Sequence, residues 1–172
     1  MSEYTREEIL KLIEENGGPE GLDLSGADLS GITLTGMDLH GIILARWDDD
    51  QHQWIAADLS CANLVDANLS GAHLVGVNLS QAKVAKANLT KANLGEANLT
   101  EANLVGADLR GATLIHADLS YGELARWDNE KEKWTAADLS GSNLLAAILS
   151  GARLCGVDFS GANLAGADLP VA

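Results

Sequence analysis

The residue types that most often carry chemistry are present in this 172-residue chain, but their spacing does not form catalytic sets. Its four histidines are scattered, and none is paired with a nucleophile: His40, His52, His73 and His116. Many carboxylates directly precede a leucine, where they interchange with asparagine, as Asp58 and Asn63 do. This interchange indicates turn formation rather than acid–base catalysis. Because the sequence also lacks a glycine-rich phosphate loop and a GxSxG motif, we expect no enzyme activity and no cofactor.

Metal ligation is the next chemistry to consider. Cys61 and Cys155 have no CxxC spacing and no histidine at ligand spacing, so we interpret both as small apolar fillers. The acidic run Asp48–Asp50, followed by His52, suggests a metal loop. A second copy of this segment carries DNEKEK in place of DDDQHQ, and neither copy has an EF-hand pattern. We therefore expect solvated loops and no metal site.

Tryptophan and arginine mark two segments as a candidate binding surface. All four tryptophans lie in LARWDDDQHQWIAADLS (Leu44–Ser60) and LARWDNEKEKWTAADLS (Leu124–Ser140). Trp and Arg are enriched among the residues that dominate protein interfaces. The candidate interaction residues are Arg46, Trp47, Trp54, Arg126, Trp127 and Trp134. The alternative, which stays open here, is that both segments are decorations whose tryptophans pack on the rest of the protein.

The elements that position these segments follow from a repeat of five residues. From Leu24 to Leu169 the central residue of each repeat is leucine, with Val84 and Phe159 as apolar exceptions. A small residue, usually alanine, lies two residues before it, except in the first coil, where this place is taken by Ile32, Met37 and Ile42. A period of five matches neither the 3.6 of a helix nor the 2.0 of a strand. The chain must therefore turn a corner in every repeat, with leucine and alanine inside and polar residues outside. Successive coils would stack at the spacing of paired strands, about 4.8 Å.

A second periodicity, of ten residues, follows the central leucines. The next residue alternates between a hydroxyl and an apolar or small side chain, as in Ser60, Val65, Ser70, Val75 and Ser80. A period of ten predicts an even number of sides. In a four-sided coil, opposite sides would then share a character.

The N-terminal segment predicts a different element, an amphipathic helix over Thr5–Asn16. Thr5 and Glu8 form a capping box, Ile9 belongs to an apolar stripe, and Gly17 and the residues after it end the helix. A helix over the first coil would cover core leucines and strand edges. The alternative is a free helix that binds a partner. We expect residues 1–21 to form a cap and linker, and residues 22–172 to form the coil.

The two tryptophan segments predict inserts at about residues 45–57 and 125–137. Each adds ten residues, so the five-residue register continues across it. Trp47 and Trp54 are spaced like the two legs of a hairpin, facing each other as a cross-strand pair. Alternatively Trp54 and Trp134, which are in phase with the leucines, enter the core. The inserts, eighty residues apart, lie on the same side if each counts as two repeats, and on opposite sides if they loop out.

The run ANLTKANLGEANLTEANL is similar to the A(D/N)LXX motif of the pentapeptide-repeat family, and the resemblance covers about residues 22–169. It implies an all-β solenoid: a right-handed, quadrilateral β-helix of twenty residues per coil, with about seven coils in this chain. Some family members dimerise at their C-terminal ends through extra elements. This chain lacks such elements, so we expect a monomer or a weak dimer.

The net charge of the chain limits the classes of partner that it can bind. The net charge of −14 argues against direct binding of nucleic acid. No apolar stretch is long enough to span a membrane, so we expect a cytoplasmic protein. We expect a non-enzymatic scaffold that binds another protein. The resemblance implies an alternative, an acidic DNA mimic that binds a type II topoisomerase such as DNA gyrase. Five cations on the repeats are expected to interrupt any uniformly negative face: Lys83, Lys86, Lys91, Arg110 and Arg153.

Overall fold

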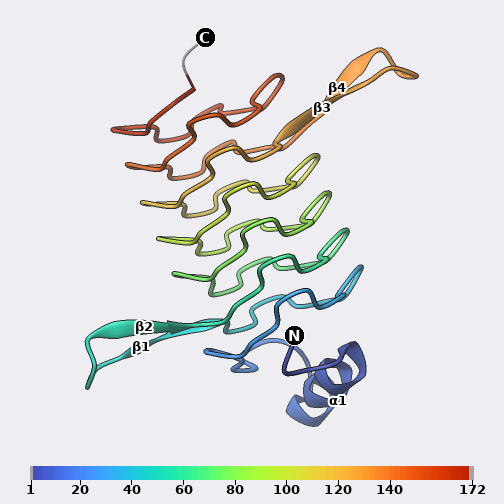
Figure 1. Ribbon diagram of the computed structural model, residues 1–172, viewed down its shortest axis with the longest axis vertical. Coiled ribbons are helices and arrows are strands. Elements are labelled where there is room, and N and C mark those ends of the chain that lie inside the picture. Colours follow the sequence, from blue (N-terminus) through green and yellow to red (C-terminus); the bar gives the residue numbers. More distant parts are fainter. Residues whose placement is uncertain (1, 171–172) are drawn as a thin grey trace.

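The computed structural model, which describes residues 2–170, is a straight solenoid with one helix and two projecting hairpins (Figure 1). The helix α1 spans Arg6–Asn16. Strands β1 (Ala45–Asp48) and β2 (Gln53–Ala56) form the first hairpin, and β3 (Ala125–Asp128) and β4 (Lys133–Ala136) form the second. Each side of the coil pairs with the next coil through a single-residue parallel bridge. The extended segments of the solenoid are therefore much shorter than ordinary strands.

The bridges define four faces. Between the inserts they join residues twenty apart, as from Asn78 to Asn98, so one coil contains four repeats. We name the ladders of bridged residues face A (Asp23 to Asn163), face B (Asp28 to Asp168), face C (Thr33 to Arg153) and face D (Asp38 to Asp158). Face A has seven levels, in agreement with the expected seven coils. The right-handed winding implied by the resemblance stays a prediction.

The central leucines and the alanines before them fill the interior, as predicted. Leu64, Leu89 and Ala92 are completely buried, and this pattern holds along most of the rod. Backbone hydrogen bonds connect the levels, such as that from the N–H of Leu64 to the carbonyl of Lys83 (2.7 Å). Each corner is a turn of two residues, closed where the alanine N–H donates back to the carbonyl of the preceding leucine.

The ten-residue alternation is confirmed by the corners. The hydroxyl residues mostly follow faces B and D, which lie opposite each other, and the apolar ones follow faces A and C. At most corners the ladder side chain accepts a hydrogen bond from the N–H two residues on, for example Asp58 Oδ1 from Ser60 (2.8 Å). Asp and Asn serve equally in this role, which explains why they interchange.

Helix α1 begins as its sequence predicts. Thr5 is the N-cap, its side chain accepts from the Glu8 N–H, and the Glu8 carboxylate accepts from the Thr5 N–H (2.7 Å). Gly17 ends the helix in the left-handed conformation (φ +81°). Ile9 is fully buried, where it borders the same small cavity as Leu24 and Leu29 of the first coil.

The opposite end of the rod is more open. Leu144, one coil from the end, is fully buried, whereas Phe159 and Leu164 in the last coil are only half-buried and Leu169 is 46% exposed. Within residues 2–170 the last coil thus leaves part of the core in contact with solvent.

Candidate interaction surface

Each tryptophan hairpin replaces one corner of the solenoid. The N–H of Ala57 donates to the carbonyl of Leu44 (2.8 Å), which is the same bond that closes an ordinary corner between Ala62 and Leu59 (3.0 Å). The second hairpin is closed in the same way, from Ala137 to Leu124 (2.8 Å). Twelve residues therefore replace two, which explains why each insert adds ten residues and leaves the register intact.

The hairpins lie on opposite sides of the rod. The first leaves the corner between faces A and B, and the second leaves the corner between faces C and D (Figure 1). Bridges such as that from Ile43 to His73 pass over the insert and keep the coil at twenty residues. The possibility that the inserts count as repeats and lie on the same side is therefore wrong. Because each hairpin loops out, the two are three and a half coils apart.

The tryptophans form facing pairs at the base of each hairpin. Trp47 pairs in register with Trp54, and their ring centroids are 5.5 Å apart at an interplanar angle of 73°. Trp127 and Trp134 repeat this arrangement at 5.5 Å and 68°. Such edge-to-face packing is favourable for aromatic rings. Because Trp54 and Trp134 stay 37% and 45% exposed, the alternative that they enter the core is wrong.

Glycines in neighbouring coils make room for both hairpins. A Cβ at Gly26 would lie 2.8 Å from Ile55 Cγ2, and one at Gly156 would lie 3.0 Å from Trp134 Cβ. A Cβ at Gly76, the equivalent position beside the first hairpin, would lie 3.7 Å from Trp54 Cβ. Both tryptophan pairs therefore face the coil that follows them in sequence.

The acidic hairpin tips form turns. Asp48 Oδ1 accepts from the N–H groups of Asp50 and Gln51 (3.0 and 3.1 Å). Asp128 makes the same pair of hydrogen bonds with Glu130 and Lys131. Side-chain capping thus accounts for the first aspartate of each tip. Within the part of the chain that the structure describes, no group of three or more His, Cys, Asp or Glu residues is arranged to hold a metal ion.

The two hairpins differ in what surrounds their arginines. Arg46 Nε lies 4.0 Å from Asp23, a loose contact. Arg126 instead makes two hydrogen bonds to Glu123 (2.8 and 3.3 Å), and this carboxylate raises the pKa of Arg126 above its ordinary value. Arg153, from the following coil, also approaches Glu123 (3.6 Å).

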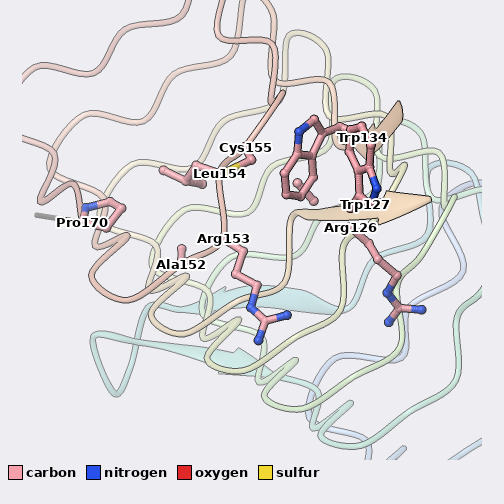
Figure 2. Close-up of a pocket in the computed structure, with 9 residues that line it drawn as sticks. Arg126, Trp127, Trp134, Ala152, Arg153, Leu154, Cys155 and Pro170 are labelled. Atoms are coloured by element: carbon pink, nitrogen blue, oxygen red, sulfur yellow. The ribbon is translucent and has the colours of Figure 1, made fainter. Parts of the chain in front are cut away.

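A groove of about 630 Å³ lies between the second hairpin and the last coil (Figure 2). The two tryptophans of this hairpin, Leu154 and Pro170 border it together with Arg126 and Arg153. Sequence reasoning placed Arg126 and the tryptophans in a candidate surface but missed Arg153, Leu154 and Pro170. The sequence contained one indication of Arg153. It follows Glu123 by thirty residues, which equals one coil of twenty residues plus the ten residues of an insert, so the two lie on the same face in neighbouring coils.

Charge divides the rod lengthwise. Faces A and B, with the corners after them and the first hairpin, hold ten carboxylates and a single cation, Arg46. Faces C and D, with their corners and the second hairpin, hold nine carboxylates and eight cations. All five cations expected to interrupt a negative surface lie on this second half. The prediction that these cations interrupt every negative face is therefore wrong for faces A and B, which they do not reach.

Solved structures similar to this chain include the following three. QnrB1, a plasmid-mediated fluoroquinolone resistance protein, is 22% identical over 81% of this chain and 75% of its own, with a TM-score of 0.43. A pentapeptide repeat protein from the Arabidopsis thaliana thylakoid lumen is 29% identical (80% and 72% covered; TM-score 0.35). HetL, involved in heterocyst differentiation regulation in the cyanobacterium Nostoc sp. strain PCC 7120, is 25% identical (96% and 94%; TM-score 0.27).

The helix in residues 2–170 is too short and too polar to cross a membrane.

No curated protein sequence matches the chain significantly. The pentapeptide-repeats family matches in eight copies, over residues 57–95, 92–125 and 135–170. These matches span more than half of the chain and coincide with the bridged coils, so the chain belongs to the pentapeptide-repeat family.

Proposed function

We propose that this protein is a non-enzymatic scaffold that binds another protein through its two tryptophan hairpins. The observation that carries the proposal is the exposure of the tryptophans, which are 37–46% accessible although each packs against its partner. Large aromatic side chains left open on projecting elements are typical of protein-binding surfaces. The hairpins leave opposite sides of the rod, so they offer two separate contacts.

The rest of the surface supports a scaffold rather than an enzyme. The outward ladder residues are mostly Asn and Asp, and many of their side chains accept turn hydrogen bonds. These side chains rigidify the coil. A rigid rod that holds two hairpins at a fixed separation is suited to positioning a partner.

A pull-down from the native host with matched variants tests this proposal. In one variant residues 45–56 are replaced by Val-Gly, the two residues that form the equivalent corner at Val75–Gly76; in another, residues 125–136 are replaced in the same way. Both should keep the circular dichroism of the rod, because the hairpins take no part in its ladders. Replacing Tyr121, an aromatic residue that is 70% exposed on the rod itself, by Ala serves as the control. A partner that is still bound when both replacements are combined in one chain would contradict the proposal.

A second candidate function is DNA mimicry, and one observation favours it. On faces A and B and their corners the rod carries no Lys or Arg among the described residues, so one long side presents carboxylates alone among its charged groups. Such a surface resembles duplex phosphates in charge. A supercoiling assay with DNA gyrase tests this: inhibition or protection at micromolar protein supports mimicry, and no effect at that concentration argues against it.

We further infer that residues 1–21 act as a cap and linker, and residues 22–172 as the solenoid. The burial of Ile9 against the first coil supports this division, because a free helix would leave that side chain in water. The capped end also favours a monomer, since it removes one surface on which a second copy could stack.

A further inference from the structure

We propose that the groove beside the second hairpin binds a short acidic peptide segment of the partner, one that carries an aliphatic or aromatic side chain next to its carboxylate. This inference rests on the proposed function and specifies which hairpin makes the contact and with what chemistry. Three features of the groove support it: its arginine pair, its apolar wall and its place in the charge distribution.

Two guanidinium groups share one carboxylate at the edge of the groove. Glu123 accepts two hydrogen bonds from Arg126 and lies 3.6 Å from Arg153. The arginine side chains are 61% and 75% exposed, and Figure 2 shows them extending in the same direction from the groove. Each guanidinium has five N–H donors, so donors remain for a second carboxylate. The set carries one excess positive charge, which an acidic side chain would neutralise.

The remainder of the groove is apolar. Trp127 and Trp134 form one wall, and Leu154 and Pro170 lie across from them (Figure 2). Leu154 is only partly buried because it belongs to the last coil, where the core is open. An aliphatic or aromatic side chain in this space would remove apolar surface from water on both sides, while the neighbouring carboxylate reaches the arginines.

Charge complementarity decides between an acidic peptide and a nucleic acid, which also combines anions with apolar faces. The half of the rod around the groove is nearly neutral, and the chain as a whole carries −14. A polyanion would be repelled by the other surfaces of the rod, since strong phosphate binding requires many cations. A short segment with one or two carboxylates contacts only the groove and avoids that repulsion.

The first hairpin provides a matched control within the same chain. Its tryptophans pair in the same geometry, but Ile43 stands where the second hairpin has Glu123, and His73 stands where it has Arg153. It also lies far from the open end of the rod. We therefore expect it to lack affinity for the same peptide.

Fluorescence anisotropy with labelled peptides tests the proposal on the full chain. The probe is fluorescein-labelled Gly-Asp-Leu-Asp-Phe-Gly amide, and the comparison probes are the same peptide with Lys in place of Asp and an eight-nucleotide oligothymidine. The variants are Arg126→Gln with Arg153→Gln, Trp134→Ala, and the first-hairpin controls Arg46→Gln and Trp54→Ala. A chain ending at Pro170 checks whether the last two residues compete for the groove. Circular dichroism verifies that each variant is folded.

The expected result is saturable binding of the acidic probe, weakened at least about tenfold by Trp134→Ala or by the double arginine variant and weakened by added salt. The controls and the shortened chain should bind at least as well as the parent. No saturable binding, equal binding of the lysine probe or oligothymidine, or equal loss in the first-hairpin variants would overturn the inference. Loss of the partner on removal of both hairpins, without binding of the acidic probe, would leave the proposed function standing and reject only this inference.

Discussion

At the scale of single residues, the corners depend on a backbone conformation that L-residues rarely adopt. The second corner residue has positive φ throughout the rod, in glycines such as Gly141 (φ +66°) and also in Lys86 and Glu101 (both φ +58°). Side chains are thus tolerated at many corners, although with some strain. Beside the hairpins glycine has a second role, because there the space for a Cβ is already occupied.

Replacing Gly156 by Ala is expected to destabilise the protein more than replacing Gly141 by Ala. Both substitutions place a side chain in the left-handed region, at a cost of roughly 1–2 kcal/mol. Only the Cβ at position 156 also lies 3.0 Å from Trp134 Cβ, so overpacking should add about 1–3 kcal/mol. Chemical denaturation monitored by circular dichroism measures the difference. Equal free energies of unfolding for the two variants would show that the second hairpin moves away freely.

His40 and Asp38 form the clearest titrating pair. His40 Nδ1 lies 2.9 Å from Asp38 Oδ1; this hydrogen bond raises the pKa of His40 and is the largest cause lowering the pKa of Asp38. The stabilisation due to the raised histidine pKa is present below its ordinary value of about 6.5, and is lost as the pH rises through the raised pKa. The stabilisation due to the lowered aspartate pKa is present above pH 3.8, the ordinary pKa of aspartate, and is lost as the pH falls through the lowered pKa.

The pair should therefore contribute most between pH 3.8 and 6.5. We predict that Asp38→Asn lowers the pKa of His40, as followed by the NMR shifts of its ring protons. A His40 midpoint unchanged by the substitution would show that the pair does not form in solution.

At the scale of elements, α1 and the hairpins are attached to the coil in different ways. The capping box and the glycine stop define α1 locally, while the burial of Ile9 attaches it to the coil. The hairpins need no such attachment, since each grows out of a corner whose closing hydrogen bond is kept.

Substitution of Ile9 by Ala is expected to lower the free energy of unfolding by about 2–5 kcal/mol, the usual loss for a large buried side chain. Ile9 is fully buried, whereas the adjacent Leu10 is 42% exposed. Leu10→Ala therefore serves as the control, with an expected change of about 0.5 kcal/mol or less. Urea denaturation of both variants gives the comparison. Similar stabilities would contradict a capping role for α1.

Much of this organisation could be predicted because it depends on local patterns. The five-residue period determines the buried leucines, Thr5 and Glu8 determine the start of the helix, and the spacing of Trp47 and Trp54 predicts a hairpin. The side on which each hairpin lies could not be decided. That requires knowing that twelve residues replace a two-residue corner rather than forming sides of the coil.

The groove escaped prediction for a related reason. Glu123, Arg153 and Pro170 are far apart in sequence, and their proximity becomes visible only after the faces are assigned with the inserts removed. The charge division has the same origin. Net charge is a property of composition, but its separation into an acidic half and a nearly neutral half depends on which ladder each residue joins.

At the scale of the whole molecule, the rod acts as a spacer that sets the separation and the relative direction of the two hairpins. Repeat proteins of this kind are stabilised mainly by contacts between neighbouring coils, so removing complete repeats should leave the remaining coils folded. The number of repeats removed then determines where the second hairpin points.

Removing ten residues, 83–92, should bring both hairpins to the same side, because three and a half coils become three. Alanine then still precedes an Asn-Leu pair, and the alternation of corners is kept because its period is also ten. Removing twenty residues, 83–102, should leave the hairpins on opposite sides. The axial separation of the hairpins in the ten-residue deletion would be three levels, about 14 Å at the spacing of paired strands.

Pulsed electron paramagnetic resonance between spin labels on the two hairpin tips measures this outcome. The labels are attached to Asp49→Cys and Glu130→Cys after Cys61 and Cys155 have been replaced by Ser. The distance should fall sharply in the ten-residue deletion, because the width of the rod no longer separates the tips. In the twenty-residue deletion it should change only by the loss of one level. If both deletions shorten the distance equally, the hairpins are not held by the faces of the coil, and the rod cannot act as the spacer that the scaffold function requires.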